Sequence, residues 1–233
     1  MRPARQLSPQ SRTPRTRAAE AIWSASRTRA CARLQRREQA LTREDYERLC
    51  LTEPQVAKAR CLAGPSGTAR ILVLRNVDKT TRRLLVSDLV PSVELKNKLG
   101  RDLADYQLLG VTLAIEDPKV RRVRVCVAVL VASDVALGDE VRSAIETTLY
   151  EQLHPLKRGF GAIIESSRLL AAVAETPGLM LVTGLRLYEI SDVVDGDGSP
   201  RERQELLPDR VELAADEVVV SDNHLVHIEA QQR

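Results

Sequence analysis

The clearest pattern in the chain is a strict alternation of apolar and other residues over positions 121–132. Successive side chains of a β-strand point to opposite faces, so residues two apart share a face. One of the two faces would consist of valines alone: Val123, Val125, Val127, Val129 and Val131. The sequence therefore predicts a long strand whose valine face lies in a core.

Other strands are indicated by shorter runs. Small or apolar residues alternate with basic ones over 56–62, and 71–74 is a continuous apolar run of the kind found in a central strand covered on both faces. Alternation also predicts strands over 111–115 and 179–190, followed by a loop over 192–200. The C-terminal part is expected to form a β-meander, with strand patterns from Arg210, at 218–220 and at 225–228, and a turn at 221–223.

Two helices are expected in the first half of the chain. Thr42 can cap a short helix that ends near Leu51, with Asp45 reaching back to the cap and Leu41 as a hydrophobic staple. A second helix would open at Pro91-Ser92 and end before Gly110. Its apolar stripe would hold Leu95, Leu99, Leu103 and Tyr106.

Two further helices are expected in the second half. One would follow Gly138-Asp139 and end before His154-Pro155, because the residue before a proline avoids the helical conformation. Its inward positions would be Val141, Ala144, Ile145, Thr148 and Leu149. The other would be capped by Ser166 or Ser167 and carry Leu169, Leu170 and Val173, before Pro177-Gly178 ends it.

This order of elements lacks a regular βαβ rhythm and indicates an α+β fold. At 233 residues and 43% apolar content, the chain can hold two small modules, expected at 39–118 and 119–233, the second ending in the meander. Residues 1–38 are rich in Arg, Ser, Thr and Pro, which predicts a basic, disordered segment or a misplaced start. Such a composition also fits an organellar transit peptide or an arm that touches phosphate.

Charge and composition narrow the function classes. Residues 1–40 carry ten Arg against Glu20 and Glu38, a net charge of +8. Because the whole chain has a formal net charge of +3, the remainder carries −5. Because the folded part is acidic and only 3% of residues are aromatic, we do not expect nucleic-acid or sugar binding. No run approaches the ~18 apolar residues of a membrane span, and no secretory signal is visible. A cytoplasmic protein is expected.

The histidines and acidic residues do not predict a catalytic or metal site. His224 and His227 would lie on opposite faces of a strand, and His154 would sit at a helix end, where a cation favours the helix dipole. The acidic turn at Asp192, Asp195 and Asp197 lacks the spacing of a calcium loop.

Other candidate motifs are equally weak. Gly159-x-Gly161 lacks the Lys-Ser/Thr of a phosphate loop, and Ser166-Ser167 lacks a nucleophile elbow. Four cysteines, expected to be reduced, show no C-x-x-C spacing: Cys31, Cys50, Cys61 and Cys126. We treat the last three as buried small hydrophobes, and we expect no catalytic residue, no cofactor and no metal.

A series of short motifs resembles the C-terminal region of baseplate J-like assembly proteins of contractile phage tails and phage-like injection systems. Residues 37–47 resemble that family's "R-A-V-T-x-E-D-Y-E" opening, and 56–61 resemble its "V-A-R-A-R-C" strand. Further matches are the helix opening at 91–95, the helix end at 153–156 and the Thr176-Pro177-Gly178 turn. The matching positions are Thr42, Asp45, Tyr46, Ala59, Arg60, Cys61, Pro91, Leu95, His154, Pro155, Pro177 and Gly178.

The order of these motifs covers about residues 33–229. The chain departs from the family in a short Arg158-Gly159-Phe160-Gly161 loop, where members have a longer Gly-Trp-Pro-Phe-Gly-like element, and in the domains that members carry upstream. A contact made by that loop is therefore in doubt, and the chain is either a short paralogue or a fragment.

The resemblance implies a structural wedge component that is not an enzyme. It would assemble with other wedge and hub subunits, and with tail tube or sheath proteins, in a particle made in the cytoplasm and released. The alternative is a small-molecule-sensing or enzymatic ferredoxin-like domain, which a closed cavity with convergent polar groups would favour. We expect the protein to form a homo- or hetero-oligomer. If the strand at 123–131 or the edge at 225–228 is unpaired, the isolated chain should self-associate.

Overall fold

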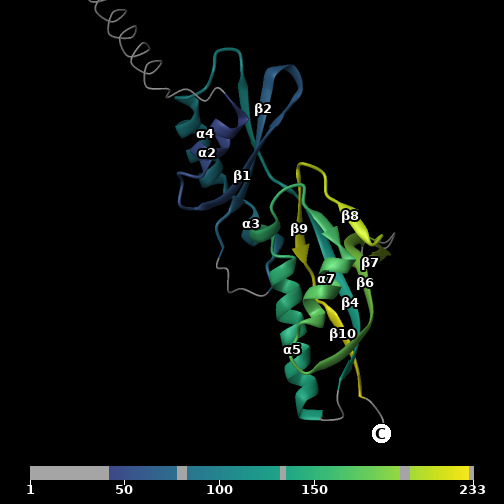
Figure 1. Cartoon of the computed structure of the whole chain (residues 1–233). Helices are drawn as coiled ribbons and strands as arrows, with labels where there is room; N and C mark the ends of the chain where they lie inside the picture. Colours follow the sequence, from purple (N-terminus) through teal and green to yellow (C-terminus); the bar gives the residue numbers. More distant parts are fainter. Residues whose placement is uncertain (1–41, 78–82, 132–134, 195–199, 231–233) are drawn as a thin grey trace, which may run out of the picture. The chain divides into compact units, whose positions relative to one another are not determined.

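The structure is a computed structural model that describes residues 42–77, 83–131, 135–194 and 200–230 (Figure 1). These residues belong to one compact unit with an α+β fold, as the mixture of helix and strand patterns predicted. The predicted disordered segment at 1–38, the staple at Leu41 and two aspartates of the acidic turn, Asp195 and Asp197, lie outside the described residues.

The first sheet has three strands in the order β1-β2-β3, with β1 antiparallel and β3 parallel to β2. The central position expected for 71–74 is confirmed, since all four of those side chains are buried. This part of the chain comprises α2 (Arg43–Cys50), β1 (Val56–Ala63), the short 3-10 helix η1 (Pro65–Gly67), β2 (Thr68–Arg75), α3 (Val86–Leu89), α4 (Val93–Ala104) and β3 (Thr112–Glu116).

The predicted cap of the first helix and the predicted start of the second at Pro91-Ser92 are confirmed. The Asp45 amide donates to the Thr42 hydroxyl at 3.2 Å, and the Asp45 carboxylate accepts from the Thr42 amide at 3.0 Å. Ser92 caps α4, but α4 ends at Ala104, so the predicted extension through Tyr106 was wrong. The chain instead tightens into turns after Ala104, and Gly110 forms the turn into β3 with a φ of 83°.

The second, larger sheet has the order β10-β4-β6-β7, and β9 pairs with β4 beside β10. The valine face predicted for the long strand is confirmed, because all five valines are at most 3% exposed. The strands are β4 (Lys119–Val131), β6 (Leu179–Val194), β7 (Pro200–Leu206), β9 (Glu217–Ser221) and β10 (Leu225–Ala230), and β5 (Ile163–Glu165) pairs with β8 (Arg210–Glu212) in a separate ribbon.

The predicted C-terminal β-meander is wrong. Both β9 and β10 run parallel to β4 and occupy successive lengths of the same edge, β9 beside 119–123 and β10 beside 126–131. A meander needs consecutive strands that pair with each other in antiparallel fashion, whereas here each of the two strands pairs with β4. β8 pairs elsewhere, with β5.

The loop expected over 192–200 was also partly wrong. β6 continues to Val194 and pairs with β7 from Pro200 onward, so the sequence missed an exposed antiparallel hairpin arm. This arm is charged, and every side chain from 201 to 206 is exposed, which explains why its pattern did not resemble a half-buried strand. Residues 195–199 lie outside the described part.

Helices α5 (Val135–Gln152) and α7 (Ser166–Ala174) cover the valine face of the larger sheet (Figure 1). α5 already contains Gly138, so the predicted start after Gly138-Asp139 was wrong, and a half-buried glycine is tolerated inside it. α7 is preceded by Glu165 as its cap, with Ser166 buried inside the first turn. Leu169 and Val173 are buried, whereas Leu170 is 41% exposed.

A second apolar cluster joins β2, α3 and β9, and its buried members are Leu74, Leu84, Leu89, Val218 and Val220. Leu156 of the short helix α6 (Pro155–Arg158) and Phe160, which follows this helix, pack against the cluster. The predicted division into modules after residue 118 stays a prediction.

Candidate assembly surface

The positions singled out by their resemblance to family motifs serve local structure and do not gather at one site. Thr42 and Asp45 form the cap of α2, and the buried Tyr46 lies one residue further on. The amide of the buried Cys61 donates to the Glu47 carboxylate of α2 at 2.8 Å, which fixes that helix on β1. Of the other family-motif positions, Pro91, Leu95 and Pro155 are buried. Half-buried or exposed are Ala59, Arg60, Pro177 and Gly178.

His154 has a different role from the one predicted. Its Nδ1 accepts a hydrogen bond at 3.2 Å from the amide of Leu156, so the side chain caps the N-terminus of α6. A cation would be unfavourable at that end of a helix, and a protonated Nδ1 could not accept the bond. The predicted role as a cation at a helix C-terminus was therefore wrong.

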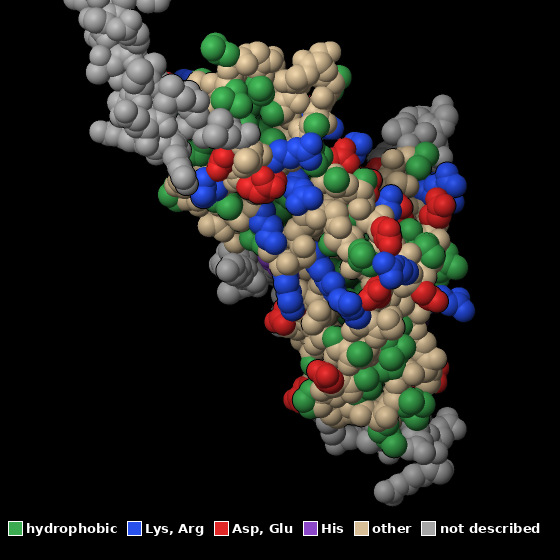
Figure 2. Space-filling view, turned by 45° about the horizontal axis from the view of Figure 1, so that its top comes forward, with side chains coloured by type: hydrophobic (Ala, Val, Ile, Leu, Met, Phe, Trp, Pro, Cys, Tyr) green, Lys and Arg blue, Asp and Glu red, His purple; other side chains and the backbone are tan. Residues whose placement is uncertain are grey.

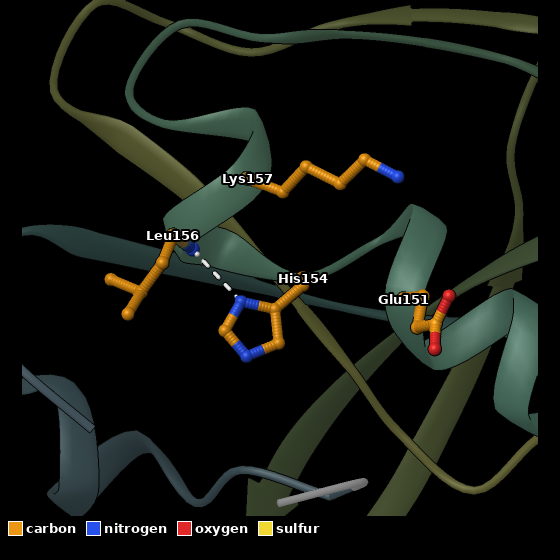
Figure 3. Close-up of a pocket in the computed structure, with 4 residues that line it drawn as sticks. All are labelled: Glu151, His154, Leu156 and Lys157. Carbon is orange, nitrogen blue, oxygen red and sulfur yellow. Dashed lines mark hydrogen bonds between the residues drawn. The ribbon is translucent and has the colours of Figure 1, made fainter. Parts of the chain in front are cut away.

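A depression of about 410 Å³ lies beside this histidine and is lined by Glu151, His154, Leu156 and Lys157. Figure 3 shows the imidazole turned toward the Leu156 amide, while the side chains of Glu151 and Lys157 extend away from it. The polar groups here do not converge on one point, as those of a small-molecule site do. The depression gives the sensing or enzymatic alternative no specific support.

A buried polar cluster lies where β9 ends and β10 begins. The Asp222 amide donates to the Val123 carbonyl, and the Val125 amide donates to His224 Nδ1 at 3.1 Å. An imidazole nitrogen thus replaces the carbonyl that an uninterrupted strand would offer to β4. Tyr150 of α5 packs against the imidazole, with ring centroids 4.6 Å apart.

Arginines neutralise the carboxylate of this cluster. Asp222 is 2% exposed, and its carboxylate lies 3.4 Å from Arg124, 3.7 Å from Arg83 and 3.9 Å from Arg122. Burial tends to raise the pKa of Asp222, but the Asn223 amide and the arginines outweigh it and lower the pKa. The acid is therefore held in its charged form.

Burial also lowers the pKa of His224 to about 4, with Arg124 adding to the effect and Asp222 opposing it. The neutral imidazole matches its role as an acceptor, so the prediction of a structural histidine is confirmed. His227 is exposed on β10, as predicted for a side chain on another face. Within the described ranges, no three His, Cys, Asp or Glu side chains gather where a metal ion could bind.

The thiols follow the prediction only in part. Cys50 and Cys61 are buried, and burial, aided by Cys61 and Glu47, raises the pKa of Cys50 to about 12. A thiol with so high a pKa is almost never a thiolate at neutral pH and is a poor nucleophile. Cys126 is only half-buried, which corrects its predicted place in a core.

Cys126 lies on the side of the larger sheet opposite α5 and α7. We call this side the open face, because many of its side chains remain exposed, including Leu181 at 56% and Leu225 at 44%. The strand register places the following residues on it: Arg124, Cys126, Ala128 and Leu130 of β4, Leu181, Gly184, Arg186 and Tyr188 of β6, Leu206 of β7, and Leu225, His227 and Glu229 of β10.

A half-covered sheet with apolar side chains on its free side is a typical protein–protein contact surface. The expectation that the strand at 123–131 might lack a neighbour is wrong, since β4 is paired on both sides, whereas β10 is confirmed as an edge of this sheet. Sequence reasoning missed the open face as a site. The available signal was the apolar second face of β4, at Cys126, Ala128 and Leu130.

Charged side chains form another surface feature. Figure 2 shows Lys and Arg side chains in a band across the middle of the face it presents, bordered by Asp and Glu. Several cations of the described part are ion-paired, as in Arg70–Glu116 at 2.7 Å and Lys119–Asp216 at 3.0 Å. Cations neutralised in this way contribute little to binding phosphate. No described helix is long and apolar enough to cross a membrane.

Comparison with known proteins gives a match by fold. No family model and no curated protein sequence matches the chain. Among solved structures, the chain is similar to a chain of the anti-feeding prophage baseplate, seen in a sixfold-symmetrised cryo-EM structure, with a TM-score of 0.53 and 17% identity. The match covers 86% of this chain and 41% of the other, so this chain spans less than half the length of its structural neighbour. The two chains share a fold.

Proposed function

We propose that this protein is a structural subunit of the baseplate of a contractile injection system and that it occupies the wedge. The observation that carries the proposal is the shared fold with an anti-feeding prophage baseplate chain over 86% of the sequence. The motif resemblance to baseplate J-like proteins rests on residues and their order, whereas the fold match rests on backbone geometry. Both lead to the same kind of assembly.

The surfaces suit work by packing. The open face offers leucine side chains to a partner, and the outer edges of β10 and β7 carry backbone groups that a further strand could pair with. In a baseplate these surfaces would contact other wedge or hub subunits, and tube or sheath proteins are possible further partners. The assembled particle would form in the cytoplasm before release.

We also propose that the protein has no enzymatic activity of its own. Three described groups with reactive potential are committed to structure: His154 caps a helix, His224 completes a strand, and Cys50 is buried with a raised pKa. Catalytic groups need free reach to a substrate atom and a pKa near the working pH. These three groups support the structural reading.

The proposal is tested by fractionating native particles. The full chain, tagged and expressed at its natural level, should sediment with sheath and tube proteins, and cells lacking the gene should produce no complete particles. A tagged chain that remains wholly in the free pool, together with normal particles in the deletion strain, would contradict the proposal.

A matched pair of variants sharpens this test. Leu181→Asp places a charge on the open face, and Leu170→Asp places the same charge at an exposed position of α7, in the helical layer on the other side of the sheet. We expect the first variant to be depleted from particles and the second to be incorporated normally, with both folding as well as the wild type.

A further inference from the structure

Two opposite charges stand on the open face without ion-pair partners among the described residues. Arg186 of β6 lies opposite Cys126, and Glu229 of β10 lies opposite Leu130. The arginines of β4 are all paired, as in Arg122–Asp192 at 2.6 Å, and Arg124–Glu202 at 3.2 Å. Both unpaired side chains are exposed beside leucines, where a complementary charge from another molecule could reach them.

The register shows why the two charges cannot pair within one chain. They lie on opposite sides of β4, two strand spacings apart, and four residues apart along the strands. At about 4.8 Å between strands and about 3.4 Å per residue, their Cα atoms are roughly 17 Å apart. The midpoint between them falls at Ala128 of β4.

We propose that the open face binds the open face of a second copy of this chain, around a twofold axis that passes over Ala128. Such an axis places Arg186 of each copy against Glu229 of the other, so a single operation makes two ion pairs. Self-complementarity of this kind is the property that a twofold interface requires. The proposal concerns the chain itself and does not rest on its place in a baseplate.

The centre of the face suits this arrangement. Residues at a twofold axis meet their own copies, and here Ala128 and the neighbouring Gly184 are small. The position of a side chain at Gly184 is open space, with no atom within 4 Å. The larger side chains of Leu181 and Leu225 lie further along the axis in the two directions, so they can fill the space beyond the small centre. With this axis, the strands of one copy cross those of the other at roughly 70°. This angle is closer to the about 90° of orthogonal sheet packing than to the about 30° of aligned packing.

The size of the face sets the expected affinity. The stretch in which β10, β4 and β6 lie side by side is six residues long. It gives a footprint of roughly 300 Å², well below the about 800 Å² that each partner buries in a standard interface. We therefore expect a reversible dimer that forms as the protein concentration rises, rather than an obligate one. High salt should weaken it, because the two ion pairs are at the rim of the contact.

Charge exchange tests the proposal with the full chain, in sedimentation velocity over a concentration series. Arg186→Glu creates two repulsive pairs in the dimer, and so does Glu229→Arg, because each substitution acts twice around the axis. Each variant alone should dimerise at least about tenfold more weakly than the wild type. An equimolar mixture of the two variants should form a heterodimer, since both pairs are then complementary again.

Arg203→Glu is the matched control. Its partner in the register is Ser191, next to the open-face pair Ile190 and Gln204, so it lies on the opposite side of the hairpin. This variant should dimerise like the wild type, and circular dichroism should show that every variant is folded. A wild type that stays monomeric at all concentrations overturns the proposal. The proposal is also overturned if the mixture of the two variants is no more dimeric than either variant alone. The open face would then bind another partner rather than a second copy.

Discussion

His224 replaces backbone at the point where the edge of the large sheet is interrupted. Its Nδ1 accepts the Val125 amide, and its buried ring packs against Tyr150, so the imidazole must stay neutral to do both. Arg124 and Asp222 neutralise each other beside it, at 3.4 Å. Three side chains thus let the chain pass from β9 to β10 without leaving the Val125 amide unpaired.

This role predicts a pH dependence of folding stability. The pKa of His224 is lowered to about 4 in the folded state, so between pH 6.5 and about 4 the unfolded chain binds the proton and the folded chain does not. The stability is fully present above pH 6.5 and is lost as the pH falls toward 4, by about 3 kcal/mol.

Urea unfolding at several pH values measures this contribution. His224→Gln, whose amide oxygen can still accept the Val125 N–H, should flatten the loss of stability in that pH window. His227→Gln, at an exposed position of β10, should leave the slope unchanged. Equal slopes in the wild type and in His224→Gln would refute the assignment.

Helix α2 depends on its first turn. Two reciprocal hydrogen bonds join Thr42 and Asp45, and the helix carries Glu47, which holds the Cys61 amide of β1. Thr42→Ala removes the cap and should lower the free energy of unfolding by about 1 kcal/mol. Denaturant titration compares it with Ser167→Ala, an exposed position inside α7 that should lose no stability. A loss of equal size in both would argue against the cap.

Strand β4 carries the core. Val127 is 1% exposed and packs against α5 and α7 in the main cluster, so Val127→Ala leaves a cavity and should cost about 2 kcal/mol. Val193→Ala, at a 39% exposed position of the β6 arm, should change the free energy of unfolding by much less. If both substitutions cost the same, measured by denaturant titration, the core does not lie where we place it.

Elements that depend on residues near each other in the sequence were predictable, and those that depend on distant partners were not. The valine face of β4 and the caps at Thr42 and Ser92 follow from spacing and side-chain chemistry within a few residues. The parallel pairing of β9 and β10 with one edge of β4 does not, because it joins segments about 100 residues apart. A meander was the natural expectation from strands near in sequence.

The candidate site shows the same limit. The pattern of β4 revealed that Cys126, Ala128 and Leu130 share its second face, but local sequence cannot tell whether a further layer covers that face. Arg186 and Glu229 come together as a charge pattern only through the strand order β10-β4-β6. His154 was placed at a helix end correctly, but at the wrong end, because α6 begins within two residues of α5.

At the level of the molecule, the large sheet has one face buried under helices and one face available, which is the architecture of a part made to be packed against others. We therefore predict that the isolated full chain self-associates in solution. If the chain occupies a wedge, as proposed above, adding a wedge subunit should raise its solubility and its melting temperature, because a partner that binds only the folded state stabilises it. Light scattering and thermal unfolding with and without the partner measure both effects.

A cryo-EM map of the native particle tests the central claim most directly. The account predicts that the baseplate contains density for this chain, with the five-stranded sheet of β4, β6, β7, β9 and β10 and helices α5 and α7 recognisable, and with the open face in contact with another subunit. A baseplate fully explained by other chains, with this protein absent from the purified particle, would contradict it.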